Sequence, residues 1–254
     1  MLKTVVIGVL IPFLGTTLGA SMVFLLKKEL KESVNKLLLG VASGVMIAAS
    51  VWSLLLPAIE MGKVNGNLVW MPASVGFLLG NFILMIVNDY LNKVETEKKD
   101  TSLSTMMMII AVTLHNIPEG MAVGVVMAAL LYGNSEITVA SAISLAIGIA
   151  IQNIPEGAII SMPLKSEGMS KGKSFIKGMI SGIVEPIGAI ITVLLTNWVI
   201  PVLPYLLSFA AGAMIYVVTA ELIPKMQEGE SLKIGRISVA IGFVIMMILD
   251  IVFG

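Results

Sequence analysis

The stretch from Leu114 to Gly120 contains the only histidine of the chain, His115, four residues before Glu119 in an otherwise apolar segment. The stretch from Gln152 to Gly157 repeats the order Asn, any residue, Pro, Glu, Gly, and a third acid, Glu185, follows in another apolar segment. Imidazole, carboxylate and amide groups without a thiolate suit Zn²⁺, Fe²⁺ or Mn²⁺ better than Cu⁺, and the imidazole nitrogen argues against a dedicated Mg²⁺ or Ca²⁺ site. The three segments therefore predict a site for a divalent transition metal.

Helical spacing would place the candidate ligands in pairs. His115 and Glu119 are four residues apart, as are Gln152 and Glu156, so each pair would share one face of a helix. A proline stands just before each glutamate, where it would remove an amide donor, bend the helix and free a carbonyl oxygen beside the site.

Composition places these segments in a membrane. Hydrophobic residues make up 57% of the 254 residues and charged residues 13%, and the mean hydropathy is +1.00, whereas about a quarter of the residues in soluble domains are charged. The length allows roughly eight spans of about 20 residues, so we expect residues 1–254 to form a single transmembrane domain. The absence of Cys excludes disulfides, thiolate metal sites and a cysteine nucleophile.

We expect an all-α integral membrane protein, because an open sheet cannot satisfy its backbone in lipid. Breaks in hydrophobicity and Pro/Gly punctuation predict eight transmembrane helices. The expected spans are 4–26, 36–58, 68–91, 103–131, 137–162, 175–198, 202–224 and 233–253.

The basic residues predict the orientation of these spans. Of the 16 Lys and Arg residues, 14 lie between spans 1 and 2, 3 and 4, 5 and 6, or 7 and 8, and only Lys3 and Lys63 lie on the other side. By the positive-inside rule these four connections are cytoplasmic, and both termini lie outside the cytoplasm.

The polar groups of spans 4, 5 and 6 are expected at one depth. At about 1.5 Å per residue, His115 lies roughly 18 Å, and Gln152 and Glu185 each roughly 15 Å, from the cytoplasmic end of its span. An ionisable group at the bilayer centre costs about 2.5–3.5 kcal/mol on insertion scales, and no Lys or Arg lies near the middle of these spans to neutralise Glu119, Glu156 and Glu185. A bound divalent cation would remove the repulsion among the three acids.

Other interpretations stay open on the residues alone. A lone histidine is often a structural hydrogen-bonding residue, and a buried glutamate can be a protonated contact between helices. An intramembrane metalloprotease would need a third strong ligand and a base, usually as His-Glu-x-x-His, and the chain has one His. A metal-gated channel is an alternative to a carrier.

Spans 2 and 7 are similar in sequence. The segments 39–46 and 208–214 share small residues and a methionine, and each span goes on to a proline after a run of apolar residues. Under the predicted topology the two spans run in opposite directions. Inverted repeats of this kind are common in secondary transporters, whose sites lie between the repeats at mid-membrane.

The motifs at His115–Gly120 and Gln152–Gly157, together with Glu185-Pro186-x-Gly188, strongly resemble those of the ZIP family of divalent-metal transporters, prokaryotic type. The resemblance covers all eight spans. It implies a 3+2+3 arrangement, in which spans 1–3 and 6–8 are inverted repeats around spans 4 and 5. It also implies that spans 1, 4, 5 and 6 slide against spans 2, 3, 7 and 8.

The same resemblance implies two metal ions in the middle of the membrane. The first would be bound by His115, Glu119, Gln152 and Glu156, and the second by Asn116, Asn153 and Glu185, with Glu119 and Glu156 bridging the two. Near the cytoplasmic end, Asp89 and Glu221 would be exit ligands.

We therefore predict a transporter, not an enzyme, that imports a divalent metal into the cytoplasm. Zn²⁺ is the first candidate substrate, and Fe²⁺, Mn²⁺ and Cd²⁺ are alternatives. The expected partners are metal ions and the lipid bilayer, and a homodimer is an alternative to the monomer; no nucleic acid and no catalytic cofactor is expected. The expected location is the cell inner membrane.

Overall fold

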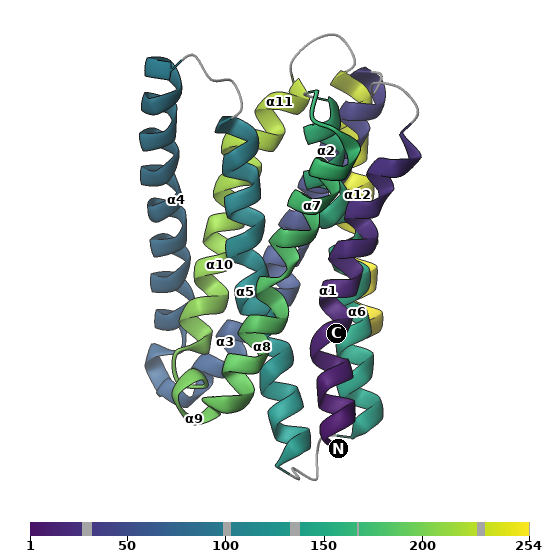
Figure 1. Cartoon of the computed structure of the whole chain (residues 1–254). Helices are drawn as coiled ribbons and strands as arrows, with labels where there is room; N and C mark the ends of the chain where they lie inside the picture. The colour runs from purple at the N-terminus through teal and green to yellow at the C-terminus, as the bar shows by residue number, and fades with distance from the viewer. Residues whose placement is uncertain (27–31, 99–102, 133–137, 167, 228–231, 254) are drawn as a thin grey trace.

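The protein is a bundle of long helices that run side by side (Figure 1). The computed structural model describes residues 1–26, 32–98, 103–132, 138–166, 168–227 and 232–253, and all regular structure in these ranges is helical. Seven helical segments of the described residues are long and apolar enough to cross a membrane. The fourth expected span is helix α5 (Leu103–Leu131), of which Glu119–Leu131 counts as a shorter apolar segment. The chain is thus a multi-pass membrane protein, and the count of eight spans stays a prediction.

The helices follow the predicted ranges, with ends that differ by up to seven residues, the largest difference being at the end of α4. In chain order they are α1 (Leu2–Ser21), η1 (Met22–Leu25), α2 (Glu32–Ala49), η2 (Ser50–Leu55), α3 (Leu56–Gly62), η3 (Lys63–Leu68), α4 (Trp70–Lys98), α5 (Leu103–Leu131), α6 (Val139–Ser166), α7 (Lys171–Gly182), α8 (Val184–Leu194), α9 (Thr196–Val199), α10 (Leu203–Val217), η4 (Val218–Leu222), α11 (Ile223–Gln227) and α12 (Leu232–Phe253).

Two of the transmembrane segments contain a π-helical turn, η2 in the second and η4 in the seventh. Each turn lies just before a proline, Pro57 or Pro224. Proline cannot donate a backbone hydrogen bond, and its ring crowds the carbonyl four residues earlier, so a wider turn relieves the clash without ending the helix. The two segments with this feature are the two that the sequence paired as similar.

The sixth transmembrane segment is interrupted at Ile183, between α7 and α8. Pro186 cannot donate to the carbonyl of Gly182, and its ring crowds that carbonyl, so the helix breaks there. The break places Glu185 in the first turn of α8. The prolines of α5 and α6 have a milder effect, because both helices continue through Pro118 and Pro155.

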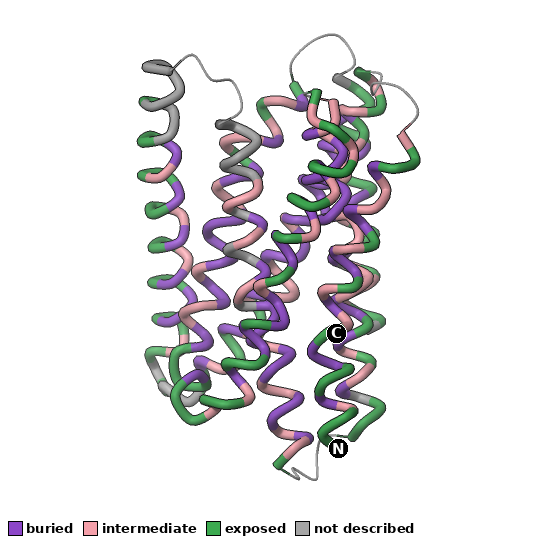
Figure 2. Tube along the Cα trace, viewed as in Figure 1, coloured by how far each residue is buried: buried purple, intermediate pink, exposed green. Residues whose placement is uncertain are grey.

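The helices pack in two sets. In the first set α1 packs along α6 and α5 packs along α8; in the second, α2 packs along α12 and α4 along α10. Helix α10 packs against α5 and makes the main contact between the sets. Figure 2 shows that buried positions follow the sides of the helices that face their neighbours, and exposed positions follow the outside.

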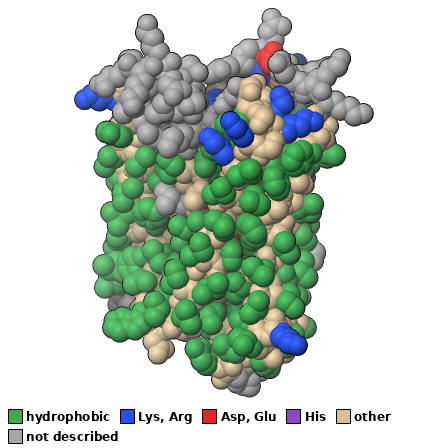
Figure 3. All heavy atoms as spheres, in the orientation of Figure 1, with side chains coloured by type: hydrophobic (Ala, Val, Ile, Leu, Met, Phe, Trp, Pro, Cys, Tyr) green, Lys and Arg blue, Asp and Glu red, His purple; other side chains and the backbone are tan. Residues whose placement is uncertain are grey.

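The face in Figure 3 is hydrophobic along most of its length, as lipid contact requires, whereas basic side chains gather at the upper end of the view. At this end α1, α4 and α11 finish and α7 begins, and the N-terminus lies at the opposite end (Figure 1). We call the end with the gathered Lys and Arg the basic end.

Candidate metal site

Three of the predicted acids are buried together in the bundle. The exposed fractions of Glu119, Glu156 and Glu185 are 3%, 1% and 0%, and these residues come from α5, α6 and α8. The charges of Glu119 and Glu156 both act on Glu185 and repel its own charge. The structure therefore brings together the three acids that the sequence placed at one depth.

Two predicted amides lie in the same interior. Asn116 and Asn153 are fully buried, and Asn116 Nδ2 donates to Glu185 Oε1 (3.1 Å) and to the Ser181 carbonyl (3.2 Å). The Asn153 amide lies near Glu185, although neither of its polar atoms makes a hydrogen bond of good geometry to the described residues. Asn116 Oδ1 and Glu185 Oε2 also accept no hydrogen bond from any described residue.

These unpaired oxygens are suited to a cation. A buried polar atom without a partner costs about 1–3 kcal/mol, so several of them at one place call for a ligand that can satisfy them. Divalent metals accept such oxygens as ligands. The oxygens in question are the amide oxygens of Asn116 and Asn153 and the second oxygen of Glu185.

A threonine that the sequence did not single out also contacts this site. Thr16, in α1, is fully buried, and its Oγ1 donates to Glu185 Oε1 at 2.6 Å. A threonine in a transmembrane helix commonly donates to a carbonyl of its own helix. No motif or spacing in the first span distinguishes Thr16 from such a residue, which is why it was missed.

Glycines let the four helices approach at this level. A Cβ atom on Gly120 would collide with the backbone of Glu185, and one on Gly157 would collide with the carbonyl of Thr16. A Cβ on Gly182 would come within 2.7 Å of the Thr16 side chain and 3.0 Å of Glu185 Oε1. Helices α1, α5, α6 and the α7–α8 break therefore meet around the acids because these positions have no side chain.

The break in the sixth segment adds an electrostatic contribution. Glu185 lies in the first turn of α8, where backbone N–H groups that the break leaves without helical partners favour negative charge. The helix dipole adds little, because α7 ends only one residue before α8 and Ile183 keeps helical dihedral angles.

The other four predicted site residues are not seen among the buried acids and amides. His115 and Gln152 lie in α5 and α6, but their side chains lie outside the described part of the structure. Among the residues that it does describe, no three His, Asp or Glu side chains form a group arranged to hold a metal. Asp89 is exposed on α4 and Glu221 is half-buried in η4, so the two predicted exit ligands are less buried than the three acids.

A cavity of about 420 Å³ lies between the two helix sets. Ala122 and Val126 of α5 line it, within two turns of Glu119 and on the side away from the basic end. It also contains Asp250 of α12, whose Oδ1 accepts a hydrogen bond from Ser53 Oγ at 2.7 Å. The sequence analysis missed this acid, although a charged residue inside the last apolar span was a visible signal.

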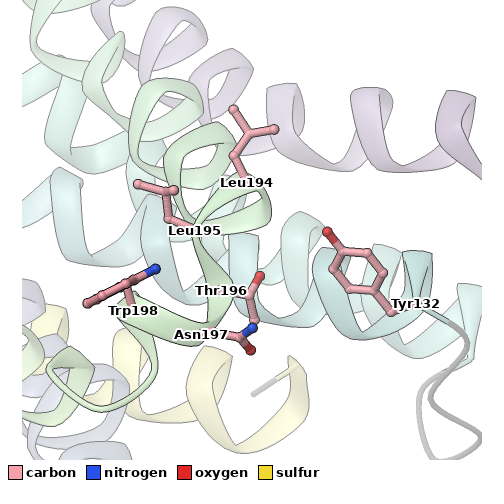
Figure 4. A pocket seen from close by; sticks show the side chains of 6 residues that line it. All are labelled: Tyr132, Leu194, Leu195, Thr196, Asn197 and Trp198. Carbon is pink, nitrogen blue, oxygen red and sulfur yellow. The ribbon is translucent and has the colours of Figure 1, made fainter.

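A groove of about 460 Å³ lies at the end opposite the basic end (Figure 4). It is lined by Tyr132 at the end of α5 and by residues 194–198 around the break between α8 and α9. Tyr132 and Trp198 are 71% and 79% exposed, as expected of aromatic residues at a membrane–water boundary. None of the six described lining residues is an acid or a histidine.

Comparison with known proteins identifies the family. The sequence model of the ZIP zinc transporter family matches residues 92–250. The chain is 32% identical to the zinc transporter ZIP11 of Xenopus tropicalis, over 98% of this chain and 96% of that protein. It is also 32% identical to the zinc transporter GufA of Myxococcus xanthus, over 94% of this chain and 95% of that protein, and to the zinc transporter ZIPB of Bordetella bronchiseptica, over 98% and 81%. The sequence similarity extends over nearly the whole chain, and the protein belongs to the ZIP family of transporters.

Proposed function

We propose that the protein imports a divalent metal, Zn²⁺ first, into the cytoplasm through the site around Glu119, Glu156 and Glu185. The observation that carries this proposal is the burial of three carboxylates in one interior, beside oxygens of Asn116, Asn153 and Glu185 that have no hydrogen-bond partner among the described residues. Buried charges and unpaired buried polar atoms are both costly, and a transported cation would lower both costs. The family consists of transporters, so the metalloprotease alternative loses its support.

The ligands divide between two metal ions in this proposal. His115, Glu119, Gln152 and Glu156 bind the first ion, and Asn116, Asn153 and Glu185 bind the second, with Glu119 and Glu156 shared. The unpaired oxygens of Asn116, Asn153 and Glu185 support the second site. The relatives' names support zinc as the substrate.

Glycine contacts support the inverted repeat. Gly44 of α2 lies against the Val239 carbonyl of α12, and its counterpart Gly212 of α10 lies against the Phe77 carbonyl of α4. The reverse contacts also match, because Gly242 lies against the Val41 carbonyl and Gly80 against the Phe209 carbonyl. Matching positions in α2 and α10 differ in residue number by one constant amount, and matching positions in α4 and α12 differ by another. The second span thus packs on the eighth in the same way as the seventh packs on the third, in agreement with the 3+2+3 arrangement.

The two helix sets support movement of one set against the other. One buried apolar cluster consists only of residues from α1, α5, α6 and α8, and a second is built mainly on α2 and α10. The cavity with Asp250 lies between the sets. We infer that metal reaches the acids from this cavity and leaves toward the basic end, where Glu221 and Asp89 are the proposed exit ligands.

Metal uptake tests the function directly. Purified protein in proteoliposomes should take up Zn²⁺ to a rate that saturates with metal concentration. Glu119→Ala and Glu156→Ala should each abolish uptake, because too few anionic ligands remain for a cation that sheds its water in an apolar interior. The exposed residue Glu60 offers a control, since Glu60→Ala removes the same charge outside the site. A rate that rises without saturation would favour a channel, and uptake unchanged by both site variants would contradict the proposal.

Glu185 belongs to only one of the two proposed metal sites, so replacing it tests the division of ligands. Glu185→Gln should lower the number of bound metal ions from two to one, because the other ligands that bind only the second ion are neutral amides. The first ion should stay, held by a nitrogen and two carboxylates. Metal counting on purified protein measures this; loss of both ions, or an unchanged count, would refute the division of ligands.

Thr16 should position Glu185 for the second ion. Thr16→Val keeps the shape of the side chain but removes the donor, and a hydrogen bond to a charged group contributes about 1.5–3 kcal/mol. We expect second-site affinity to fall by roughly tenfold or more, measured by equilibrium metal titration. Thr16→Ser keeps the hydroxyl and should bind as the unchanged protein does; equal affinity in the Val and Ser variants would remove Thr16 from the site.

The orientation can be tested with introduced cysteines, since the chain has none. Gly172 at the start of α7 and Asn197 in α9 are both exposed and lie at opposite ends of the bundle. In intact cells a membrane-impermeant thiol reagent should label Asn197→Cys and leave Gly172→Cys unlabelled until the cells are opened. The opposite pattern would place the basic end outside.

A further inference from the structure

Positive charge is distributed unevenly among the four connections at the basic end. The segment 27–36 has four Lys against two acids, and 165–177 has four Lys against one acid. By contrast, 89–100 has three Lys against four acids, and 221–236 has three basic residues against three acids. The excess of positive charge therefore belongs to the connections that follow α1 and precede α7.

The structure joins η1, the short helix that follows α1, to the start of α7. Lys171 Nζ donates to the Phe24 carbonyl at 3.1 Å, and the rings of Phe24 and Phe175 lie 5.3 Å apart, centre to centre. Two segments far apart in sequence thus form one surface. We call it the α1–α7 surface, and its described members are Phe24, Leu25, Lys171, Lys173, Ile176, Lys177 and Ile180.

The α1–α7 surface has a charged part and an apolar part in the order in which a leaflet presents headgroups and chains. Lys173 and Lys177 are exposed and one helical turn apart, so they share a face of α7. Ile176 and Ile180 are also exposed and one turn apart. Because α7 runs from the basic end into the membrane (Figure 1), Ile180 lies deeper than Lys173.

We propose that the α1–α7 surface binds an anionic phospholipid of the adjoining leaflet. Lys173 and Lys177 contact the headgroup phosphate, and Phe24, Ile176 and Ile180 contact the acyl chains. Lysines at this level lay their stems along apolar surface and keep the ammonium group in the headgroup region. A soluble phosphate would cover only the charged part, whereas a lipid covers both parts.

The exposed pair Lys233 and Arg236 at the start of α12 provides a matched control. It lies at the same end of the bundle and carries the same charge, but its connection has no net excess of positive charge. If the general attraction of a basic end for anionic lipid were the whole effect, both pairs would contribute equally.

Native mass spectrometry of the purified protein, titrated with phosphatidylglycerol or phosphatidylcholine, tests the proposal without any metal. Lys173→Gln with Lys177→Gln should weaken the first phosphatidylglycerol by up to about fivefold for each lysine, and arginine at both positions should restore it. Lys233→Gln with Arg236→Gln should leave this binding unchanged.

Three results would overturn the proposal. They are equal weakening by the control pair, phosphatidylcholine binding as tightly as phosphatidylglycerol, and displacement of phosphatidylglycerol by an equal concentration of inorganic phosphate. Thermal melting of each variant shows that it is folded. Failure of this experiment leaves metal transport untouched, because neither the lysines nor the lipid belongs to the metal site.

Discussion

The burial of three carboxylates in one place is the constraint on which the rest of this structure depends. Glu119, Glu156 and Glu185 repel one another in an interior of low dielectric constant, where a charge is costly even when alone. The chain lowers that cost at Glu185 with hydrogen bonds from Thr16 and Asn116. In the proposed function, a divalent cation binds the oxygens of Glu185, Asn116 and Asn153 that have no hydrogen-bond partner among the described residues.

Close backbone contact is a second consequence of the same constraint. Hydrogen bonds from one helix to a carboxylate on another require the helices to lie closer than ordinary side chains allow. Gly120 and Gly157 provide this approach beside the acids, and Gly44 and Gly212 provide it between the other helices. Because lipid gives no hydrophobic drive for helix association, contacts between small residues do much of the packing.

Sequence patterns predicted the parts of this protein that have a local signature. Helix ranges followed from hydrophobicity because lipid admits few alternatives, and the acids were found because a charge in an apolar run is conspicuous. Thr16 was missed because its partner is distant in sequence and its type is ordinary in a membrane helix. The break at Ile183 and the π turns before Pro57 and Pro224 were missed because proline signals a disturbance without saying whether the helix breaks, widens or continues.

The hydrogen bonds to Glu185 also bear on how a carrier could release its cargo. Thr16 and Asn116 both donate to Oε1, so one carboxylate oxygen is held by α1 and α5 while Oε2 has no donor among the described residues. Donors of this kind keep the carboxylate charged and oriented before a metal arrives, so binding does not have to ionise or turn it. With one oxygen held and one oxygen open, an ion can enter and leave at the open oxygen while the helices keep their places.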